Sequence, residues 1–302
     1  MAEDTSRRLD GTVQIVCGAG GGLGEETAVA MANAGATVVV NDLGVGVDGD
    51  GADAEPAEET VERITEAGGD ATAHFGDVTD LAYTEELIED TVETYGAIHG
   101  VTNYAGILRD SMVFNMSEDD WDAVVDVHLK GHFSVLKAVS AHWRERYKAE
   151  GFDRERSVCC VSSGASAGNP GQANYSAAKA GILGLMRTTA RELHQYDVRV
   201  NALWPTALTR MTEDLPAMAG ADESTIGPQH VAPVPVFLAS EDAAGVTGCT
   251  VAVMGEQLSI VSDPERERTL SASGDLWEVD EIAGRWDELT DGFETTRLTP
   301  GY

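Results

Sequence analysis

Residues 12–24 read TVQIVCGAGGGLG, a short run of mostly apolar and β-branched residues followed at once by a turn that is mostly glycine. The run predicts a buried strand, and the residues after the turn predict a helix from about Gly22 to Ala34. Glycine lets the backbone turn tightly and approach a ligand closely, while the N–H groups at a helix N-terminus attract negative charge. A strand, a glycine turn and a helix in this order therefore predict a binding site for the diphosphate of a dinucleotide.

The same alternation of strands and helices continues along the chain. Further strands are predicted at residues 37–40, 71–75, 98–103, 157–161, 198–203 and 250–253, and further helices at about 55–67, 79–95, 174–195 and 231–239. Strands that alternate with helices form a parallel sheet covered on both faces. The predicted fold is α/β, a doubly wound, Rossmann-like parallel sheet in a single domain over residues 1–260. The polar segment 261–302 is expected to be a C-terminal extension packed on that domain.

The net charge of the chain argues against two classes of partner, nucleic acids and anionic membranes. Its 302 residues include 52 Asp and Glu against 20 Lys and Arg, a net charge of −32. Such a surface repels nucleic-acid phosphates and anionic lipid, so neither is an expected partner. The four cysteines have no metal-ligand spacing, and no apolar run reaches the length of about 20 residues that spans a membrane. These features predict a cytoplasmic protein with reduced thiols, no bound metal and a small-molecule substrate.

The end of the second predicted strand bears on the type of dinucleotide. An acidic side chain at this place, here Asp42, accepts hydrogen bonds from the ribose hydroxyls of an adenosine. No Lys or Arg occurs from Leu9 through Glu62, so a ribose 2′-phosphate would face Asp42 without a local cation. The sequence therefore favours NAD over NADP, unless a basic residue folds in from elsewhere. The alternative for Asp42 is a solvated acid at a strand end.

Tyr175 and Lys179 lie four residues apart, so a helix places both on one face. Reduction of a carbonyl needs a proton donor at the oxygen, and a phenol with a pKa of about 10 is a slow donor at neutral pH. An ammonium about 4 Å away stabilises the phenolate by about 4 kcal/mol at an effective dielectric constant of about 20. That energy corresponds to about three pKa units, so we expect Lys179 to bring the pKa of Tyr175 near 7.

Ser162 stands thirteen residues before Tyr175, at the end of a predicted strand. A hydroxyl at a strand end is expected to hydrogen-bond the substrate oxygen and to align it with Tyr175. The alternative is that Tyr175 and Lys179 are an ordinary surface pair. The presence of Ser162 and the glycine turn in the same chain argues against this alternative.

Together these residues resemble the short-chain dehydrogenase/reductase family over about residues 10–255. Five longer motifs resemble one subgroup, the (3R)-hydroxyacyl-CoA dehydrogenase domain of peroxisomal multifunctional enzyme type 2. They lie at residues 105–110, 127–131, 171–179, 210–212 and 267–270. The resemblance implies an NAD-dependent oxidoreductase that interconverts a secondary alcohol and a ketone, here 3-hydroxyacyl-CoA and 3-oxoacyl-CoA. It also implies that Ser162, Tyr175 and Lys179 are catalytic and that the protein is a homo-oligomer, a dimer or a tetramer.

The resemblance assigns the cofactor-binding residues as well. They are Gly18, Gly22, Leu23, Gly24, Asp42, Asp77, Val78, Asn103, Ala105, Gly106, Tyr175, Lys179, Pro205 and Thr209. Asp77 is expected to contact the adenine, and Thr209 to help hold the nicotinamide carboxamide.

Three positions depart from the pattern of the family. Tyr104 replaces a usual Asn and is expected to crowd the turn near the cofactor, and Thr206 replaces a usual Gly. His128 stands where a relay Asn is common, although the subgroup shares it. We expect His128 to be a fourth catalytic residue that relays protons through water, and the alternative is a packed helix histidine.

Other functions and roles remain open. A steroid or small-alcohol dehydrogenase would use the same catalytic residues, and a non-catalytic NAD-binding sensor would fit the departures at Tyr104 and Thr206. Residues 211–227 are expected to form a lid loop. Arg109 and Arg210 are expected to flank the substrate opening, where each either pairs with anionic groups of coenzyme A or forms a surface salt bridge.

The acidic excess is spread along the chain, which has only four lysines, as in proteins adapted to high salt. At about 1 M salt the screening length is about 3 Å, so self-repulsion is tolerable there and destabilising in dilute buffer. We expect the Tm to rise from dilute buffer to molar KCl and the structure to be lost on desalting. An equal Tm in the two solutions, measured by circular dichroism, would contradict this salt adaptation.

Overall fold

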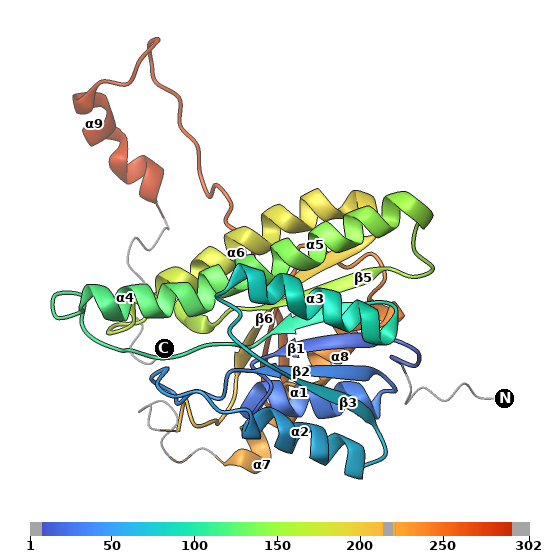
Figure 1. Ribbon diagram of the computed structural model, residues 1–302. Coiled ribbons are helices and arrows are strands. Elements are labelled where there is room, and N and C mark those ends of the chain that lie inside the picture. The colour runs from blue at the N-terminus through green and yellow to red at the C-terminus, as the bar shows by residue number, and fades with distance from the viewer. Residues whose placement is uncertain (1–7, 214–219, 221, 292–302) are drawn as a thin grey trace. The chain divides into compact units, whose positions relative to one another are not determined.

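The computed structural model describes residues 8–213, 220 and 222–291, in which eight strands form one sheet (Figure 1). The strands are β1 (Val13–Cys17), β2 (Thr37–Asp42), β3 (Asp70–Phe75), β4 (Gly100–Asn103), β5 (Arg156–Val161), β6 (Val198–Thr206), β7 (Thr250–Met254) and β8 (Gln257–Val261). Their order across the sheet is β3-β2-β1-β4-β5-β6-β7-β8. Neighbouring strands are parallel except β7 and β8, which form an antiparallel hairpin. The predicted doubly wound parallel sheet is confirmed, and β8 is an addition to it.

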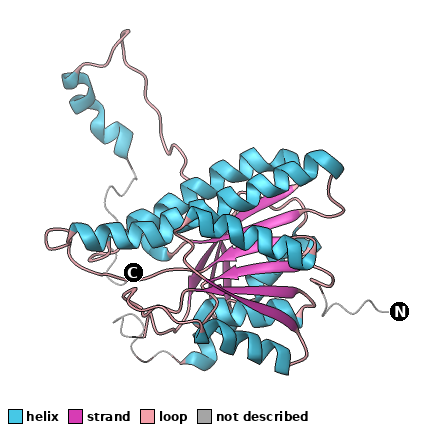
Figure 2. Ribbon diagram, in the orientation of Figure 1, coloured by secondary structure: helices cyan, strands magenta, loops and turns pink. Residues whose placement is uncertain are grey.

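Helices cover both faces of the sheet, as Figure 2 shows. The helices of the described residues are α1 (Gly22–Asn33), α2 (Glu55–Glu66), α3 (Leu81–Tyr95), α4 (Glu118–Val125), α5 (Gly131–Glu150), α6 (Ala173–Leu193), α7 (Glu223–Ile226), α8 (Pro233–Ala239) and α9 (Val279–Thr290), of which α9 belongs to a separate C-terminal unit. In Figure 1, α3, α5 and α6 lie over one face, and α1, α2 and α8 lie over the other. One turn of π-helix, Asp126–Lys130, joins α4 to α5.

Apolar side chains fill the space between the sheet and each helical layer. On one side Ile15, Trp143 and Ile182 belong to a single buried cluster. Trp143 also donates a hydrogen bond from Nε1 to the Ile98 carbonyl, 3.0 Å away, so its polar atom is paired. Met31 belongs to a second cluster on the opposite side. Burial of each large apolar side chain contributes about 1.5–3 kcal/mol, and these two layers hold the strand ends in place.

The direction of the strand order reverses at β1, because β2 lies on one side of it and β4 on the other. In such sheets the connections leave a crevice at the carboxyl ends of the strands beside the reversal. The glycine turn after β1 opens into this position. A Cβ atom at Gly24 would lie 1.9 Å from the carbonyl oxygen of Gly18, so only glycine allows α1 to pack this closely on β1.

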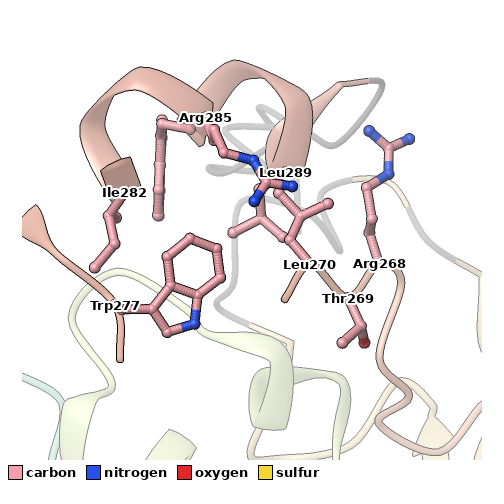
Figure 3. A pocket seen from close by; sticks show the side chains of 8 residues that line it. Arg268, Thr269, Leu270, Trp277, Ile282, Arg285 and Leu289 are labelled. Carbon is pink, nitrogen blue, oxygen red and sulfur yellow. The ribbon is translucent and has the colours of Figure 1, made fainter. Parts of the chain in front are cut away.

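The chain divides into two compact units, Met1–Val261 and Ser262–Tyr302. In the second unit a pocket of about 340 Å³ lies between α9 and the segment before it (Figure 3). Its lining residues are Arg268, Thr269, Leu270, Trp277, Ile282, Arg285, Trp286 and Leu289. Ile282, Trp286 and Leu289 follow one another at helical spacing, which gives α9 an apolar face. Packing of this extension on the first unit stays a prediction.

Candidate active site

The start of α6 is fixed by polar side chains that reach other segments. Asn174 Nδ2 donates to the carbonyl oxygens of Arg109, at 3.0 Å, and Asp120, at 3.1 Å. Gln172 Nε2 donates to the carboxylate of Asp110 at 2.7 Å. These bonds tie the first turn of α6 to the segment after β4 and to the start of α4. They position Tyr175, one residue further on, at the carboxyl end of the sheet.

Tyr175 and Lys179 lie together, as the helical spacing predicts. The Lys179 Nζ atom is 5.4 Å from the centre of the Tyr175 ring and donates to the Val161 carbonyl oxygen at 2.8 Å. Lys179 is buried, with 3% of its surface exposed. The Lys179 side chain thus lies beside the Tyr175 ring and is hydrogen-bonded to the last residue of β5.

The pKa of Tyr175 moves in the direction opposite to the sequence-based expectation. Burial raises the pKa of Tyr175 to about 12; the nearby Ser163 hydroxyl lowers this pKa, and the charge of Asp110 raises it further. Burial also lowers the pKa of Lys179 to about 7. Removal from water disfavours the charged form of both groups, so Tyr175 and Lys179 are both neutral between about pH 7 and about pH 12. The expectation of a tyrosine pKa near 7 is therefore wrong for the protein without its cofactor.

The structure also corrects the expected geometry of Ser162. Its hydroxyl donates to the carbonyl oxygen of Lys179 at 2.9 Å, and the residue is buried, with 1% of its surface exposed. The next residue, Ser163, is instead the serine whose hydroxyl lies near enough to Tyr175 to lower the pKa of the phenol. Successive side chains of an extended segment point to opposite sides, so adjacent serines have different surroundings. Ser162 ties β5 to α6, and Ser163 is the serine beside the tyrosine.

His128 lies in the π-helical turn and packs edge-on against Tyr175, with ring centres 4.9 Å apart and planes at 88°. The shorter of its two contacts with Ile107, 2.8 Å to the carbonyl oxygen, assigns Nε2–H as a donor. Burial and then the charge of Lys179 hold the pKa of His128 well below 6.5, so the ring is neutral. Its Nδ1 atom is buried and has no hydrogen-bond partner among the described residues. A neutral histidine with a free acceptor thus faces the tyrosine.

The glycine turn offers backbone donors to an anion. No described side chain caps the first turn of α1, whose N-cap residue is Gly21. Asp42, at the end of β2, accepts hydrogen bonds from the N–H groups of Gly20 and Gly44, both at 2.6 Å. A Cβ atom at Gly18 would lie 2.5 Å from the Ala105 nitrogen, so the turn packs directly on the segment after β4. Open N–H groups at a helix N-terminus, with a carboxylate beside them, fit the diphosphate and ribose of a dinucleotide.

The other predicted cofactor residues lie along the same edge of the sheet. Asp77 and Val78 follow β3, and Gly106 follows β4 beside the ring of His128. Asn103, the last residue of β4, accepts the N–H of Ala105 at 2.9 Å, and its Nδ2 atom is buried without a partner in the described chain.

The segment that ends β6 reaches the glycine turn from the opposite side. Pro205 is in β6, and Thr209 comes within 3.9 Å of the place that a Cβ atom of Gly22 would occupy. The expected lid, residues 211–227, lies partly outside the described residues at 214–219 and 221. Its described end forms α7.

Tyr104 packs against the glycine turn through its backbone, since a Cβ atom at Gly18 would lie 2.7 Å from the Tyr104 carbonyl carbon, while its side chain turns toward α1. Its hydroxyl lies 2.8 Å from the Thr27 hydroxyl of α1, and its ring packs with the apolar clusters on the α1 side of the sheet. The side chain therefore occupies the space beneath α1, where its bulk is used in packing.

Arg109 is paired with polar groups of the chain itself. Its Nε donates to the Asp48 carbonyl at 2.9 Å, and its guanidinium lies 3.8 Å from the carboxylates of both Asp50 and Asp120. The surface salt bridge, one of the two alternatives for this residue, is the one that the structure contains.

Two absences concern other kinds of site. The described residues contain no group of three or more His, Cys, Asp or Glu side chains that could hold a metal ion. Within the same part of the chain, every helix is too short or too polar to cross a lipid bilayer.

Comparison with known proteins finds relatives in one family of dehydrogenases. The sequence pattern of the family described as short chain dehydrogenase matches residues 12–219. The chain is 41% identical over 280 residues to the hydroxyacyl-CoA dehydrogenase ChsB1 of Mycobacterium tuberculosis, covering 91% of this chain and 87% of that protein. It is 40% identical over 240 residues to the peroxisomal multifunctional enzyme type 2 of Drosophila melanogaster, covering 80% of this chain and 38% of that protein. The crystal structure of a short chain dehydrogenase from Mycobacterium avium superposes with a TM-score of 0.83 at 39% identity, covering 93% and 95% of the two chains.

Proposed function

Since the chain belongs to the short-chain dehydrogenase family, we propose that it is an NAD-dependent dehydrogenase that interconverts 3-hydroxyacyl-CoA and 3-oxoacyl-CoA. The observation that carries the proposal is the set of side chains around Tyr175, where Ser163, His128 and Lys179 converge on one phenol. The substrate class rests on the relatives, one of which is named as a hydroxyacyl-CoA dehydrogenase.

In the proposed reduction Tyr175 donates its proton to the substrate carbonyl oxygen, and Ser163 donates a second hydrogen bond to the same oxygen. The nicotinamide, when bound, supplies the hydride that reaches the carbonyl carbon. One hydride and one proton together convert the ketone to the secondary alcohol. The phenolate left on Tyr175 is stabilised by the Lys179 ammonium.

Lys179 and His128 supply the proton path in this proposal. The amine of Lys179 exchanges a proton near neutral pH, because burial lowers its pKa to about 7. The open Nδ1 acceptor of His128 holds a water that returns a proton toward Tyr175. A water here would also satisfy an acceptor whose burial otherwise costs about 1–3 kcal/mol.

Asp42 supports NAD as the cofactor. One carboxylate oxygen accepts the N–H of Gly20 in the glycine turn and the other accepts the N–H of Gly44 after β2, so the negative charge is fixed where the adenosine ribose would lie. A ribose 2′-phosphate would be repelled at that position. NADP with a cation from another segment is the alternative, and comparison of kcat/KM for NADH and NADPH decides between them.

We further propose a cytoplasmic homo-oligomer. Four free thiols support a reducing compartment. On α6 the small residues Ala177, Ala180 and Gly184 are exposed, and they would allow a helix of another subunit to approach closely. Gly181 is different, because a Cβ atom there would lie 2.9 Å from Leu129 of the same chain.

A steroid or small-alcohol dehydrogenase is the second candidate enzyme, because the residues around Tyr175 would serve any ketone. A non-catalytic NAD-binding sensor would need no acid at the substrate oxygen, and the arrangement of Tyr175, Ser163 and Lys179 speaks against it. A panel of ketones separates the three functions.

We expect the protein in molar KCl to oxidise NADH when acetoacetyl-CoA is added. Tyr175→Phe removes the proton donor and should lower the rate by about a hundredfold or more, while NADH still binds. The decrease of NADH absorbance measures the rate, and fluorescence of bound NADH measures binding. Binding of NADH with turnover of no 3-oxoacyl thioester, steroid or simple ketone would overturn the proposed reaction and favour the sensor.

The two adjacent serines give a matched pair of variants. Ser163→Ala should lower kcat/KM by about a hundredfold and leave the Tm close to that of the parent, because the lost bond is to the substrate oxygen. Ser162→Ala should lower the free energy of unfolding by about 1 kcal/mol, since it removes a buried hydrogen bond, and should change kcat/KM far less. The reverse assignment of the two effects would mean that Ser162 is the catalytic serine.

A further inference from the structure

Three consecutive glycines of the turn after β1 each face a different side chain. The N–H of Gly20 donates to Asp42. A Cβ atom at Gly21 would lie 2.9 Å from an Nη atom of Arg210, and one at Gly22 would lie 3.9 Å from the Cγ2 of Thr209. The turn is therefore flanked by an acid at one end, a guanidinium over its middle and a threonine at the other end.

Arg210 has no carboxylate partner among the described residues. It is exposed and forms no ion pair with a described residue, although the whole chain carries 52 acidic side chains. Arg63, by contrast, lies 2.7 Å from both Glu25 and Glu26 of α1. A cation is unfavourable near the N-terminus of a helix, where the macrodipole is positive. An anion between the guanidinium and the helix end would reverse the sign of this interaction.

We propose that Arg210 binds the diphosphate of the cofactor. This inference rests on the dinucleotide site proposed above. Asp42 lies beside Gly20, where the adenosine ribose would bind, and Thr209 lies beside Gly22, on the side where the nicotinamide would bind. Arg210 lies beside Gly21, between these two positions, and so faces the diphosphate. Arginine suits this role because its planar guanidinium forms two parallel hydrogen bonds to phosphate oxygens. The loop after β6 thus supplies the cation that the segment from Leu9 through Glu62 lacks.

Binding measurements at one fixed KCl concentration test this assignment. Isothermal titration gives Kd values for NADH, NADPH, ADP-ribose and adenosine with the full-length parent and with Arg210→Ala and Arg210→Lys. We expect Arg210→Ala to weaken NADH and ADP-ribose by about the same factor, roughly tenfold, and to leave adenosine unchanged, because adenosine has no phosphate. Arg210→Lys should recover part of the loss. Arg144→Ala, which removes an exposed arginine of α5, is the control for net charge and should bind all four ligands as the parent does.

Each other result has a distinct meaning. A parent protein that binds neither NADH nor NADPH overturns the proposed function itself. If the parent binds NADH and Arg210→Ala binds it equally well, the function stands and the role of Arg210 is overturned. A higher KM for acetoacetyl-CoA with an unchanged Kd for NADH would assign Arg210 to coenzyme A. A loss confined to NADPH would assign it to the 2′-phosphate.

Discussion

A lysine amine buried beneath a tyrosine ring is the constraint on which the site depends. Transfer of an ammonium from water into a protein costs several kcal/mol unless a partner compensates, and the Lys179 Nζ atom has the Val161 carbonyl oxygen as its acceptor. Burial therefore lowers the pKa of Lys179 to about 7, from 10.5 in water. The stability that the neutral amine contributes is present above pH 10.5 and is lost as the pH falls to about 7, because the unfolded chain binds the proton first.

The packing around this amine links the fold to the proposed chemistry. The Ser162 hydroxyl holds the Lys179 carbonyl, so the end of β5 and the middle of α6 are joined at the backbone as well as at the side chain. With that joint fixed, Ser163, two residues after β5, and the ring of His128 in the π-helical turn lie beside Tyr175. In the free protein the tyrosine is neutral, which is the form that donates a proton to a ketone.

The sequence predicted the features that depend on local pattern, and it missed those that depend on distant partners. The sheet, the glycine turn and the facing of Tyr175 and Lys179 follow from strand and helix periodicity. The choice between Ser162 and Ser163 depends on which side of a strand end faces α6, and the position of Tyr104 depends on Thr27, 77 residues away. The π-helical turn before α5 is only five residues long, so it produces no periodic pattern in the sequence. The expected pKa of Tyr175 was wrong because it followed from the charge of Lys179 alone and left out burial, which acts on both groups.

The protonation of Lys179 is the quantity that tests this account most directly. The chain has only four lysines, so NMR of protein labelled with ¹³C at lysine Cε gives a simple spectrum, and Lys179→Arg identifies one signal by its loss. The account predicts that this signal titrates near pH 7 in the protein without cofactor. A Lys179 signal that stays protonated up to about pH 10, as a lysine in water does, would contradict the buried amine at the centre of the site.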